Sequence, residues 1–355
     1  MNQTSTKAKT LAILNRNKGV YYSGQELADY LGVTRAAVWK AVKNLRLEGY
    51  EITGTTNKGY ALAVDADVLD PDSIRENLTP KENKFYRKIV CLPETTSTNT
   101  LIKERYANSK LEGLVVSAEM QTEGRGRFGR SFHSPAGSGV YFSLLLKPKG
   151  TSQKATLITA AAAVAGAKAC ERINDKLREG DVNIKWVNDL CLNGRKICGI
   201  LTESSILFES GEMEYVVLGV GINLTFDAKK APKELKKTVG GLFSKSAPTG
   251  ARAKLIAAFL SEFHTIYESL FKKEGPSTRD AFETLLENYR RRLLFVGRRV
   301  DVVKNSFQEN ETRTATVVGV DEQFNLLVVF DDEPAKIAAL NGGEIRARLQ
   351  TPLST

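Results

Sequence analysis

Residues 121–130, QTEGRGRFGR, alternate glycine with arginine, and the elements on either side of this stretch decide the fold. Glycine lets the backbone approach a ligand closely, and the guanidinium groups of Arg125, Arg127 and Arg130 can each pair with carboxylate or phosphate through two hydrogen bonds. The spacing matches neither the Walker phosphate loop nor the dinucleotide-binding fingerprint. We therefore predict a flexible anion-binding loop of another type; contact with RNA is the alternative for a basic loop of this kind.

The segment before this loop joins a short strand to a cluster of small polar residues. Residues 89–92 predict the strand, and residues 94–99, ETTSTN, follow it. A helix is expected to begin near Thr100. The polar cluster can bind a small polar ligand, or it can serve only as the cap of that helix.

The segments after the loop predict a mixed sheet flanked by helices. Alanine-rich residues 155–177 predict a packed helix, and residues 183–191 predict a strand that contains Asn188 and Asp189. Asn193 and Gly194 then predict a hairpin turn, followed by a returning strand over residues 195–201.

A further buried strand is predicted over residues 215–224. Gly219 and Gly221 are expected where a side chain would obstruct a close neighbour, and Asn223 follows them. The lysine-rich residues 229–245 are expected to form a solvated or ligand-ordered loop.

The N-terminal residues predict a helix-turn-helix. A first helix is expected near residues 7–15, and a second begins at the capping box of Ser23 and Glu26 and ends at Gly32. Thr34 can cap a third helix, whose apolar positions recur at three- and four-residue steps. In this layout the last helix enters the major groove of DNA.

A basic wing is predicted next, because residues 50–62 have the pattern of two short strands around a polar turn at residues 55–59. Cations of the last helix and of the wing are expected to contact DNA: Arg35, Lys40, Lys43 and Lys58. A helical protein-interaction module with solvated lysines is the alternative interpretation.

The chain is therefore expected to be a multidomain α+β protein. We predict a winged helix-turn-helix domain over residues 1–66, a linker over 67–85, a central mixed-sheet α/β domain over 86–292 and a C-terminal domain over 293–355. In the last region three segments alternate apolar and polar positions, which predicts a small antiparallel β-barrel: residues 300–303, 312–318 and 326–330.

Composition narrows the class of protein. A net charge of +10 favours polyanionic partners, and the absence of a long apolar run or an export signal predicts a cytoplasmic protein with no membrane partner. The four cysteines show no C-x-x-C pairing and are expected to be reduced and mostly buried. Two histidines leave little material for a histidine-rich metal site or a Ser-His-Asp triad.

Taken together, the motifs resemble the biotin protein ligase and biotin operon repressor family, specifically its bifunctional members. The matching segments follow in family order: residues 97–99, 124–130, 185–189, 195–201 and 219–223. Each motif is weakly specific by itself, but their order and spacing are highly specific. The winged helix and residues 342–345 extend the likeness over nearly the full chain. The resemblance implies a catalytic domain similar to class II aminoacyl-tRNA synthetases and biotin ligases.

The same resemblance implies roles for individual residues. Biotin is implied to contact Ser97, Thr98, Asn99, Gln121, Gly124, Arg125, Gly126, Arg127, Ser143, Lys196 and Gly199. The nucleotide is implied to contact Arg127, Arg130, Phe132, Asn188, Asp189 and Asn223. The catalytic cations are implied to be Lys196, Arg125 and Arg127, and Asp189 is the candidate to support Mg²⁺. Two positions depart from the family pattern: Phe132 stands where members often have Trp, and Val187 where they often have Pro.

The implied activity is the synthesis of biotinyl-5'-AMP from biotin and ATP, followed by transfer of biotin to a lysine of a biotin carboxyl carrier protein of acetyl-CoA carboxylase or a related carboxylase. The resemblance also implies an adenylate-bound homodimer that binds operator DNA and represses biotin operon genes. Two alternatives remain at this point: a lipoate-type ligase, and a transcription factor that senses a metabolite without ligase activity.

Overall fold

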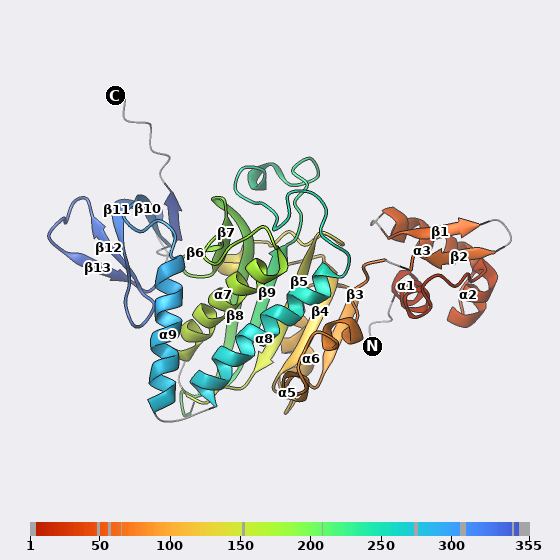
Figure 1. Cartoon of the computed structure of the whole chain (residues 1–355), viewed down its shortest axis with the longest axis horizontal. Helices are drawn as coiled ribbons and strands as arrows, with labels where there is room; N and C mark the ends of the chain where they lie inside the picture. Colours follow the sequence, from red (N-terminus) through yellow and green to blue (C-terminus); the bar gives the residue numbers. More distant parts are fainter. Residues whose placement is uncertain are drawn as a thin grey trace. The chain divides into compact units, whose positions relative to one another are not determined.

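The computed structural model describes residues 5–47, 50–55, 58–64, 66–150, 153–207, 209–272, 276–305, 310–342 and 344–347. Figure 1 shows the helices and strands of the chain. The chain divides into two compact units. The first runs to Leu146 and adds Gly219–Ala231 and Gly241–Ala258, and the second contains the other described residues. Each unit is described by itself.

The N-terminal elements are those of a winged helix: α1 (Thr6–Arg16), α2 (Gly24–Leu31), α3 (Arg35–Leu47), β1 (Ile52–Thr55) and β2 (Gly59–Leu62). The capping box is formed, because the Glu26 carboxylate accepts from the Ser23 amide at 2.6 Å and the Ser23 hydroxyl accepts from the Glu26 amide at 3.0 Å. Gly32 ends α2 with a left-handed φ of 64°, where a side chain would be strained. The predicted helix-turn-helix and its two strands are confirmed. Thr56 and Asn57 of the predicted wing lie outside the described residues.

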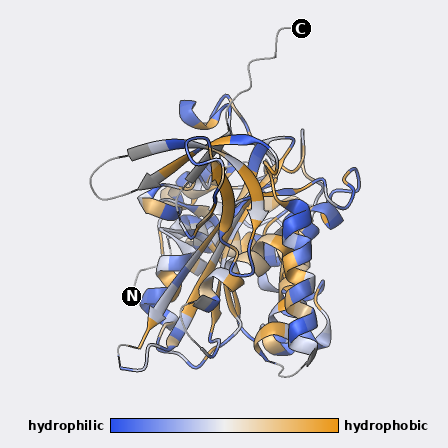
Figure 2. Cartoon of the chain, turned by 90° about the vertical axis from the view of Figure 1, so that its left-hand side faces the viewer, coloured by the Kyte–Doolittle hydropathy of each residue, from blue (hydrophilic) through white to orange (hydrophobic). Residues whose placement is uncertain are grey.

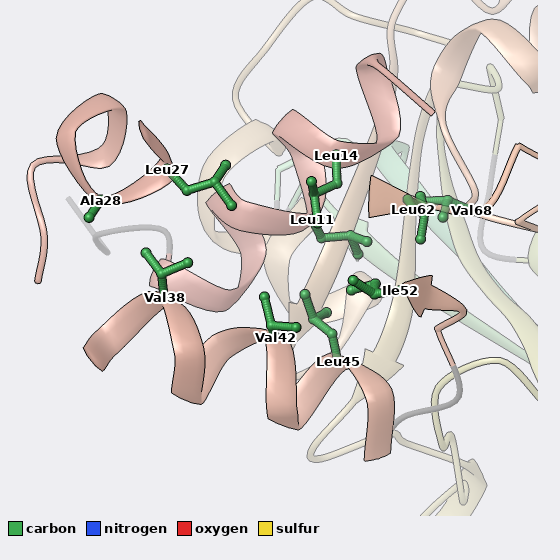
Figure 3. Packing of buried hydrophobic residues seen from close by; sticks show 10 residues of the cluster. All are labelled: Leu11, Leu14, Leu27, Ala28, Val38, Val42, Leu45, Ile52, Leu62 and Val68. Atoms are coloured by element: carbon green, nitrogen blue, oxygen red, sulfur yellow. The ribbon is translucent and has the colours of Figure 1, made fainter. Parts of the chain in front are cut away.

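A small apolar core holds these elements together. Figure 3 shows side chains from α1 and α3 pointing toward one another, with Leu27 of α2 and Ile52 and Leu62 of the wing completing the cluster. Val68, which follows the wing in the chain, is buried in the same cluster. Burial of these side chains stabilises the winged helix by the hydrophobic effect.

Two short helices lie within the stretch predicted as a linker, residues 67–85. They are α4 (Pro71–Arg75), capped by Asp70, and α5 (Pro80–Phe85), capped by Thr79. Each begins with proline directly after a capping residue, a combination that marks a helix start even when no apolar periodicity follows.

Seven strands are hydrogen-bonded in the order β3-β4-β5-β9-β8-β7-β6. Their bounds are Ile89–Thr95 (β3), Leu114–Gln121 (β4), Gly139–Leu146 (β5), Asn183–Lys185 (β6), Asp189–Leu192 (β7), Arg195–Ile206 (β8) and Met213–Asn223 (β9). The boundary between the two units falls within β9. Figure 2 shows hydrophobic residues concentrated on the strands and on one side of the helices, and hydrophilic residues in the connecting loops.

In the first unit, β3 runs parallel to β4, whereas β4 and β5 are antiparallel, so the predicted mixed sheet is confirmed. The helix α6 (Thr98–Tyr106) packs on β4 and β5. In the second unit, β6, β7 and β8 are antiparallel, and α7 (Gln153–Ile173) packs on β8 and on α9 (Pro276–Arg292). The predicted hairpin turn is formed, because Asn193 and Gly194 have φ values of 51° and 74°.

The C-terminal region is an antiparallel sheet with strand order β13-β12-β11-β10-β14. The strands are β10 (Arg299–Asn305), β11 (Asn310–Val320), β12 (Leu326–Phe330), β13 (Ile337–Leu340) and β14 (Glu344–Ala347), and the first three include the segments predicted as strands. Over the residues that the structure describes, β13 and β14 stand at opposite ends of this order and are not paired with each other.

Candidate active site and DNA-binding surface

A buried network of polar side chains occupies the end of β4 and the start of α6. The Gln121 amide oxygen accepts from the Thr98 amide at 2.9 Å and from the Thr98 hydroxyl at 3.2 Å. Its amide nitrogen donates to the Ser134 hydroxyl at 3.0 Å. Ser97 caps α6 by accepting from the Thr100 amide at 3.5 Å. The polar cluster is therefore a helix cap at Ser97, and the next residue belongs to a separate network.

Ser143, on strand β5, joins this network through residues of α6. Its fully buried hydroxyl lies 2.6 Å from the Thr98 hydroxyl and 2.5 Å from the Asn99 side-chain oxygen. Three elements, β4, β5 and α6, thus hold four predicted biotin residues together: Thr98, Asn99, Gln121 and Ser143. Buried donors and acceptors that bond to one another keep their positions, because each alternative position leaves a polar group unpaired.

The glycines of β9 allow two of the predicted residues to approach the sheet. A Cβ atom at Gly219 would lie 2.2 Å from the Asn99 side-chain oxygen, and one at Gly221 would lie 2.5 Å from the Phe132 ring. Both neighbours belong to the first unit. The prediction that these two glycines make room for close neighbours is confirmed.

The glycine-arginine stretch folds as a hairpin. The Phe132 amide donates to the Gly124 carbonyl and the Gly126 amide donates to the Arg130 carbonyl, both at 2.7 Å. The tip is a short 3-10 turn, Arg127–Gly129, in which Phe128 has a φ of 57° and is 54% exposed. The Arg127 guanidinium lies 4.8 Å from the centre of the Phe128 ring.

In this arrangement the arginines of the hairpin lie at the surface. Arg125 and Arg130 are exposed and Arg127 is half-buried. Gly124, by contrast, is buried, and a Cβ there would lie 2.3 Å from the Phe132 carbonyl oxygen. The base of the loop is therefore fixed by close backbone packing, and the cationic side chains extend from its outer part.

In the second unit, a cation and a carboxylate are paired on adjacent strands. Lys196 Nζ of β8 lies 2.7 Å from Asp189 Oδ1 of β7, and the two side chains are 33% and 20% exposed. Asn188 is tied to β8 by two hydrogen bonds, since its side chain donates to the Ile200 carbonyl at 2.6 Å and its carbonyl accepts from the Ile200 amide at 2.9 Å. Gly199 lies opposite Asp189 in the strand pairing.

A backbone strap runs beside Lys196. The Lys196 amide donates to the Thr238 carbonyl at 2.8 Å, and the Gly240 amide donates to the Lys196 carbonyl at 2.9 Å. The strap belongs to the lysine-rich stretch that was predicted to be a solvated or ligand-ordered loop. It contains a 3-10 turn, Lys233–Leu235, whose residues are mostly exposed.

Two aromatic residues near this cluster were not among the predicted site residues. The buried Trp186 donates its indole N–H to the Phe324 carbonyl at 2.9 Å, and the Tyr289 hydroxyl donates to the Val187 carbonyl at 3.1 Å. These bonds attach the segment between β6 and β7 to the C-terminal sheet and to α9. A tryptophan in a short polar segment is the signal that could have indicated such an anchor, because a buried indole N–H needs an acceptor.

The cysteines are free and mostly buried, as was predicted. Burial raises the pKa of the Cys170 thiol to about 12 and that of Cys191 to about 11. Burial also raises the pKa of Cys198 and of Cys91, and all four cysteines are free. None of them has the lowered pKa of a nucleophilic cysteine.

The exposed side of α3 carries the predicted cations Arg35, Lys40 and Lys43, and Lys58 is exposed beside the wing. Trp39, which was not predicted to take part, is 57% exposed on the same helix, and Lys43 Nζ lies 5.3 Å from the centre of its ring. An exposed tryptophan among cations adds an apolar surface to this side of the helix.

Comparison with known proteins identifies the family. A family model described as the biotin/lipoate A/B protein ligase family matches residues 91–223, and an HTH domain model matches residues 6–61. A bifunctional ligase/repressor BirA of Bacillus spizizenii is 36% identical over 270 residues, which are 74% of this chain and 79% of that protein. The chain belongs to the bifunctional biotin ligase/repressor family.

A further relative and a solved structure are also similar to the chain. The bifunctional ligase/repressor BirA of Escherichia coli is 28% identical over 352 residues, covering 98% of this chain and 99% of that protein. Among solved structures, a biotin protein ligase of Aquifex aeolicus in complex with biotin and ATP has a TM-score of 0.57 and 24% identity, over 74% of this chain and 99% of that one. This last likeness shows the fold.

Family membership raises the question of a metal ion at Asp189. The Asp189 carboxylate is already paired with Lys196, and the described part of the chain contains no group of three or more His, Cys, Asp or Glu side chains that could hold a metal. These residues therefore do not fit a metal ion held by the protein.

Among the helices that the structure describes, none is both long enough and apolar enough to span a lipid bilayer.

Proposed function

We propose that this bifunctional family member joins biotin to ATP, transfers the biotinyl group to a carrier-protein lysine, and represses transcription through its winged helix. The observation that carries the ligase part is the buried network of Gln121, Thr98 and Ser143, which lies beside a glycine-arginine loop. The network offers neutral hydroxyl and amide groups, and biotin has a neutral ureido ring with N–H donors and a carbonyl acceptor. The loop offers cations, which suit a carboxylate and a phosphate.

Adenylation is proposed as a direct displacement. The biotin carboxylate attacks the α-phosphorus of ATP, the bond from this phosphorus to the bridging oxygen of pyrophosphate breaks, and pyrophosphate leaves with the electron pair. Because the substrate itself is the nucleophile, the protein needs to position the two substrates and to neutralise the charge that develops. We assign this task to Arg125, Arg127 and Lys196.

The nucleotide contacts are proposed for Arg127, Arg130, Phe132, Asn188, Asp189 and Asn223. Asn223 is buried at the end of β9, and the Phe132 ring packs against Gly221 of the same strand. Pairing with Asp189 would hold the Lys196 ammonium in place before ATP arrives. We propose that Mg²⁺ enters on the triphosphate of ATP, where its charge would offset that of the phosphate oxygens.

The remaining biotin contacts are proposed for Ser97, Asn99, Gly124, Gly126 and Gly199. The hairpin is proposed to close over the adenylate and to exclude water, because a mixed anhydride must survive until the carrier arrives. The neutral amine of the carrier lysine then attacks the acyl carbon, the bond from this carbon to the AMP oxygen breaks, and the amine loses a proton to solvent. The products are an amide and AMP.

The partners are proposed on the same basis. The carrier is a biotin carboxyl carrier protein of acetyl-CoA carboxylase or a related carboxylase, and the C-terminal strands, proposed to close into a small barrel, assist in binding it and ATP. Ordering of the hairpin by the adenylate is proposed to favour a homodimer, and a two-fold dimer would match a palindromic operator. Arg35, Lys40, Lys43 and Lys58 are the proposed contacts with that DNA.

The ligase function is tested by incubating the protein with biotin, ATP, Mg²⁺ and a purified apo carrier domain, and then measuring the mass of the carrier by mass spectrometry. The expected result is the mass increase of one biotinyl group on a single lysine. Lipoate in place of biotin should leave the mass unchanged. A carrier modified only by lipoate, or no adenylate from either vitamin, would contradict the proposal and favour one of the two alternatives.

A further inference from the structure

Arg252, at the start of α8 (Ala251–Phe271), is a buried cation that the proposed chemistry does not use. Its side chain is 3% exposed, and its guanidinium contacts three groups. Nε donates to Asp67 Oδ2 at 3.1 Å, one Nη donates to the Asp67 carbonyl, and the other Nη donates to the Glu119 carboxylate. All three residues belong to the first unit.

Glu119 connects the same cation to a second point of the segment after the wing. Glu119 is 3% exposed, and its other carboxylate oxygen accepts from the Leu69 amide at 3.0 Å. The ion pair thus holds the chain on both sides of Val68. Val68 in turn is buried in the apolar core of the winged helix.

The other end of this contact lies beside the proposed biotin site. Glu119 and Gln121 are two residues apart on β4, so they lie on the same face of the strand. Gln121 bonds to Thr98, and Thr98 bonds to Ser143. Contacts therefore run from the segment after the wing through Arg252 to Glu119, and one residue of β4 separates Glu119 from Gln121 of the network.

A contribution to the stability of the fold does not by itself explain why a buried ion pair stands at this position. A buried ion pair loses its hydration, and apolar residues of similar volume often stabilise a protein equally well. Burial acts to lower the pKa of Arg252, but the carboxylates of Glu119 and Asp67 more than offset this, so the pKa is raised and the cation is kept. What the pair adds is a fixed position for the two segments that it joins.

We propose that Arg252 and Glu119 couple the occupancy of the biotin site to the winged helix. Residues 67–69 are the segment through which the coupling acts, and Arg252 is a positioning residue that touches no substrate. The inference rests on the proposed function, because it requires that biotin and ATP bind to the network. Coupling of this kind is reciprocal, so whatever the winged helix binds should in turn strengthen adenylate binding.

The structure also offers a matched control. Lys7 of α1 pairs with Glu94 of β3 at 3.3 Å, but the two side chains are 17% and 43% exposed. An exposed pair of this kind is weakened by water and salt. Lys7→Ala removes an ion pair between the winged helix and the sheet without changing the buried contacts.

The experiment measures hydrogen exchange of the winged-helix amides in the full chain, with and without biotin, ATP and Mg²⁺. In the wild type, these ligands should slow exchange in α1 and α3 by roughly fivefold or more, the lower end of ordinary coupling. In Asp67→Ala and in the double variant Arg252→Met/Glu119→Leu, the ratio of the exchange rates without and with the ligands should fall to nearly one. In Lys7→Ala this ratio should stay as in the wild type. The double variant removes both charges together, so neither is left buried without its partner.

Calorimetry with biotin and a pyrophosphate-release assay distinguish a failure of the coupling from a failure of the proposed ligase function. Asp67→Ala should bind biotin within about twofold of the wild type, since Asp67 is not part of the network. If the wild type adenylates biotin but its winged-helix exchange does not respond, or if the double variant responds as the wild type does, the coupling is refuted. If the wild type makes no adenylate, the proposed function itself is wrong.

Discussion

The buried network at Ser143 and the exposed arginines of the hairpin lie in the same unit, yet they are built in opposite ways. The network is neutral, and each of its groups already has a hydrogen-bond partner. The arginines belong to a turn whose tip is at the surface. The difference follows from solvation, because neutral groups can be paired in a protein interior at modest cost, whereas isolated charges cannot. A neutral network can therefore be built into the interior in advance, whereas cations that are proposed to bind an anion stay at the surface.

The largest effect is expected at Lys196, a cation of the second unit to which the proposal assigns the same task as to the hairpin arginines. Lys196→Ala should slow adenylation by roughly two to three orders of magnitude, as expected when one preorganised charge contact is lost. Release of pyrophosphate from biotin and ATP measures this rate. Arg195→Ala, which removes an exposed cation from the neighbouring position of β8, is the control and should have little effect. A Lys196 variant with normal kcat would remove this residue from the chemistry.

The next effect tests the neutral network. Ser143→Ala should raise the KM for biotin by roughly 5- to 150-fold, since leaving a buried partner unpaired costs about 1–3 kcal/mol. Steady-state kinetics in biotin and in ATP should show little change in the KM for ATP. Ser117→Ala is a matched control, because Ser117 is also fully buried but bonds to the Tyr141 carbonyl at 3.2 Å. Equal changes in KM for both variants would mean that the network has no special role.

The two glycines of β9 allow the proposed biotin contacts and the proposed ATP contacts to be tested separately. A methyl group at Gly219 would displace Asn99, and one at Gly221 would displace the Phe132 ring. Gly219→Ala should therefore raise mainly the KM for biotin, and Gly221→Ala mainly the KM for ATP, each by on the order of tenfold. Isothermal calorimetry with each substrate measures the same effects. The assignment fails if both substitutions weaken the same substrate.

The smallest effect concerns the buried thiols, where no reaction is expected. The raised pKa values of Cys170 and Cys191 keep both thiols protonated at pH 8, and burial also shields them from reagents. Iodoacetamide at pH 8 should therefore label neither residue in the folded protein and both in urea. Rapid labelling of either thiol without denaturant would show that the interior of the second unit opens in solution.

Much of the fold followed from local signals. The capping box at Ser23, the Asn193-Gly194 turn and the two glycines of β9 each have a short-range physical cause, and each is formed as expected. The helices α4 and α5 were missed because their start signals stand without the apolar periodicity on which the prediction relied. Trp186 and Tyr289 were missed because their partners lie far away in the chain.

The sequence by itself determined the residue types of the site and their order, because glycine, arginine and small polar residues carry their chemistry wherever they stand. It also determined the winged helix, whose core comes from neighbouring segments. Only the tertiary structure decided that Ser143 meets Thr98, that Phe132 rests on Gly221, and that Arg252 holds both Asp67 and Glu119. These contacts join residues far apart in the chain, and their partners are set by strand order and packing, which no local pattern encodes.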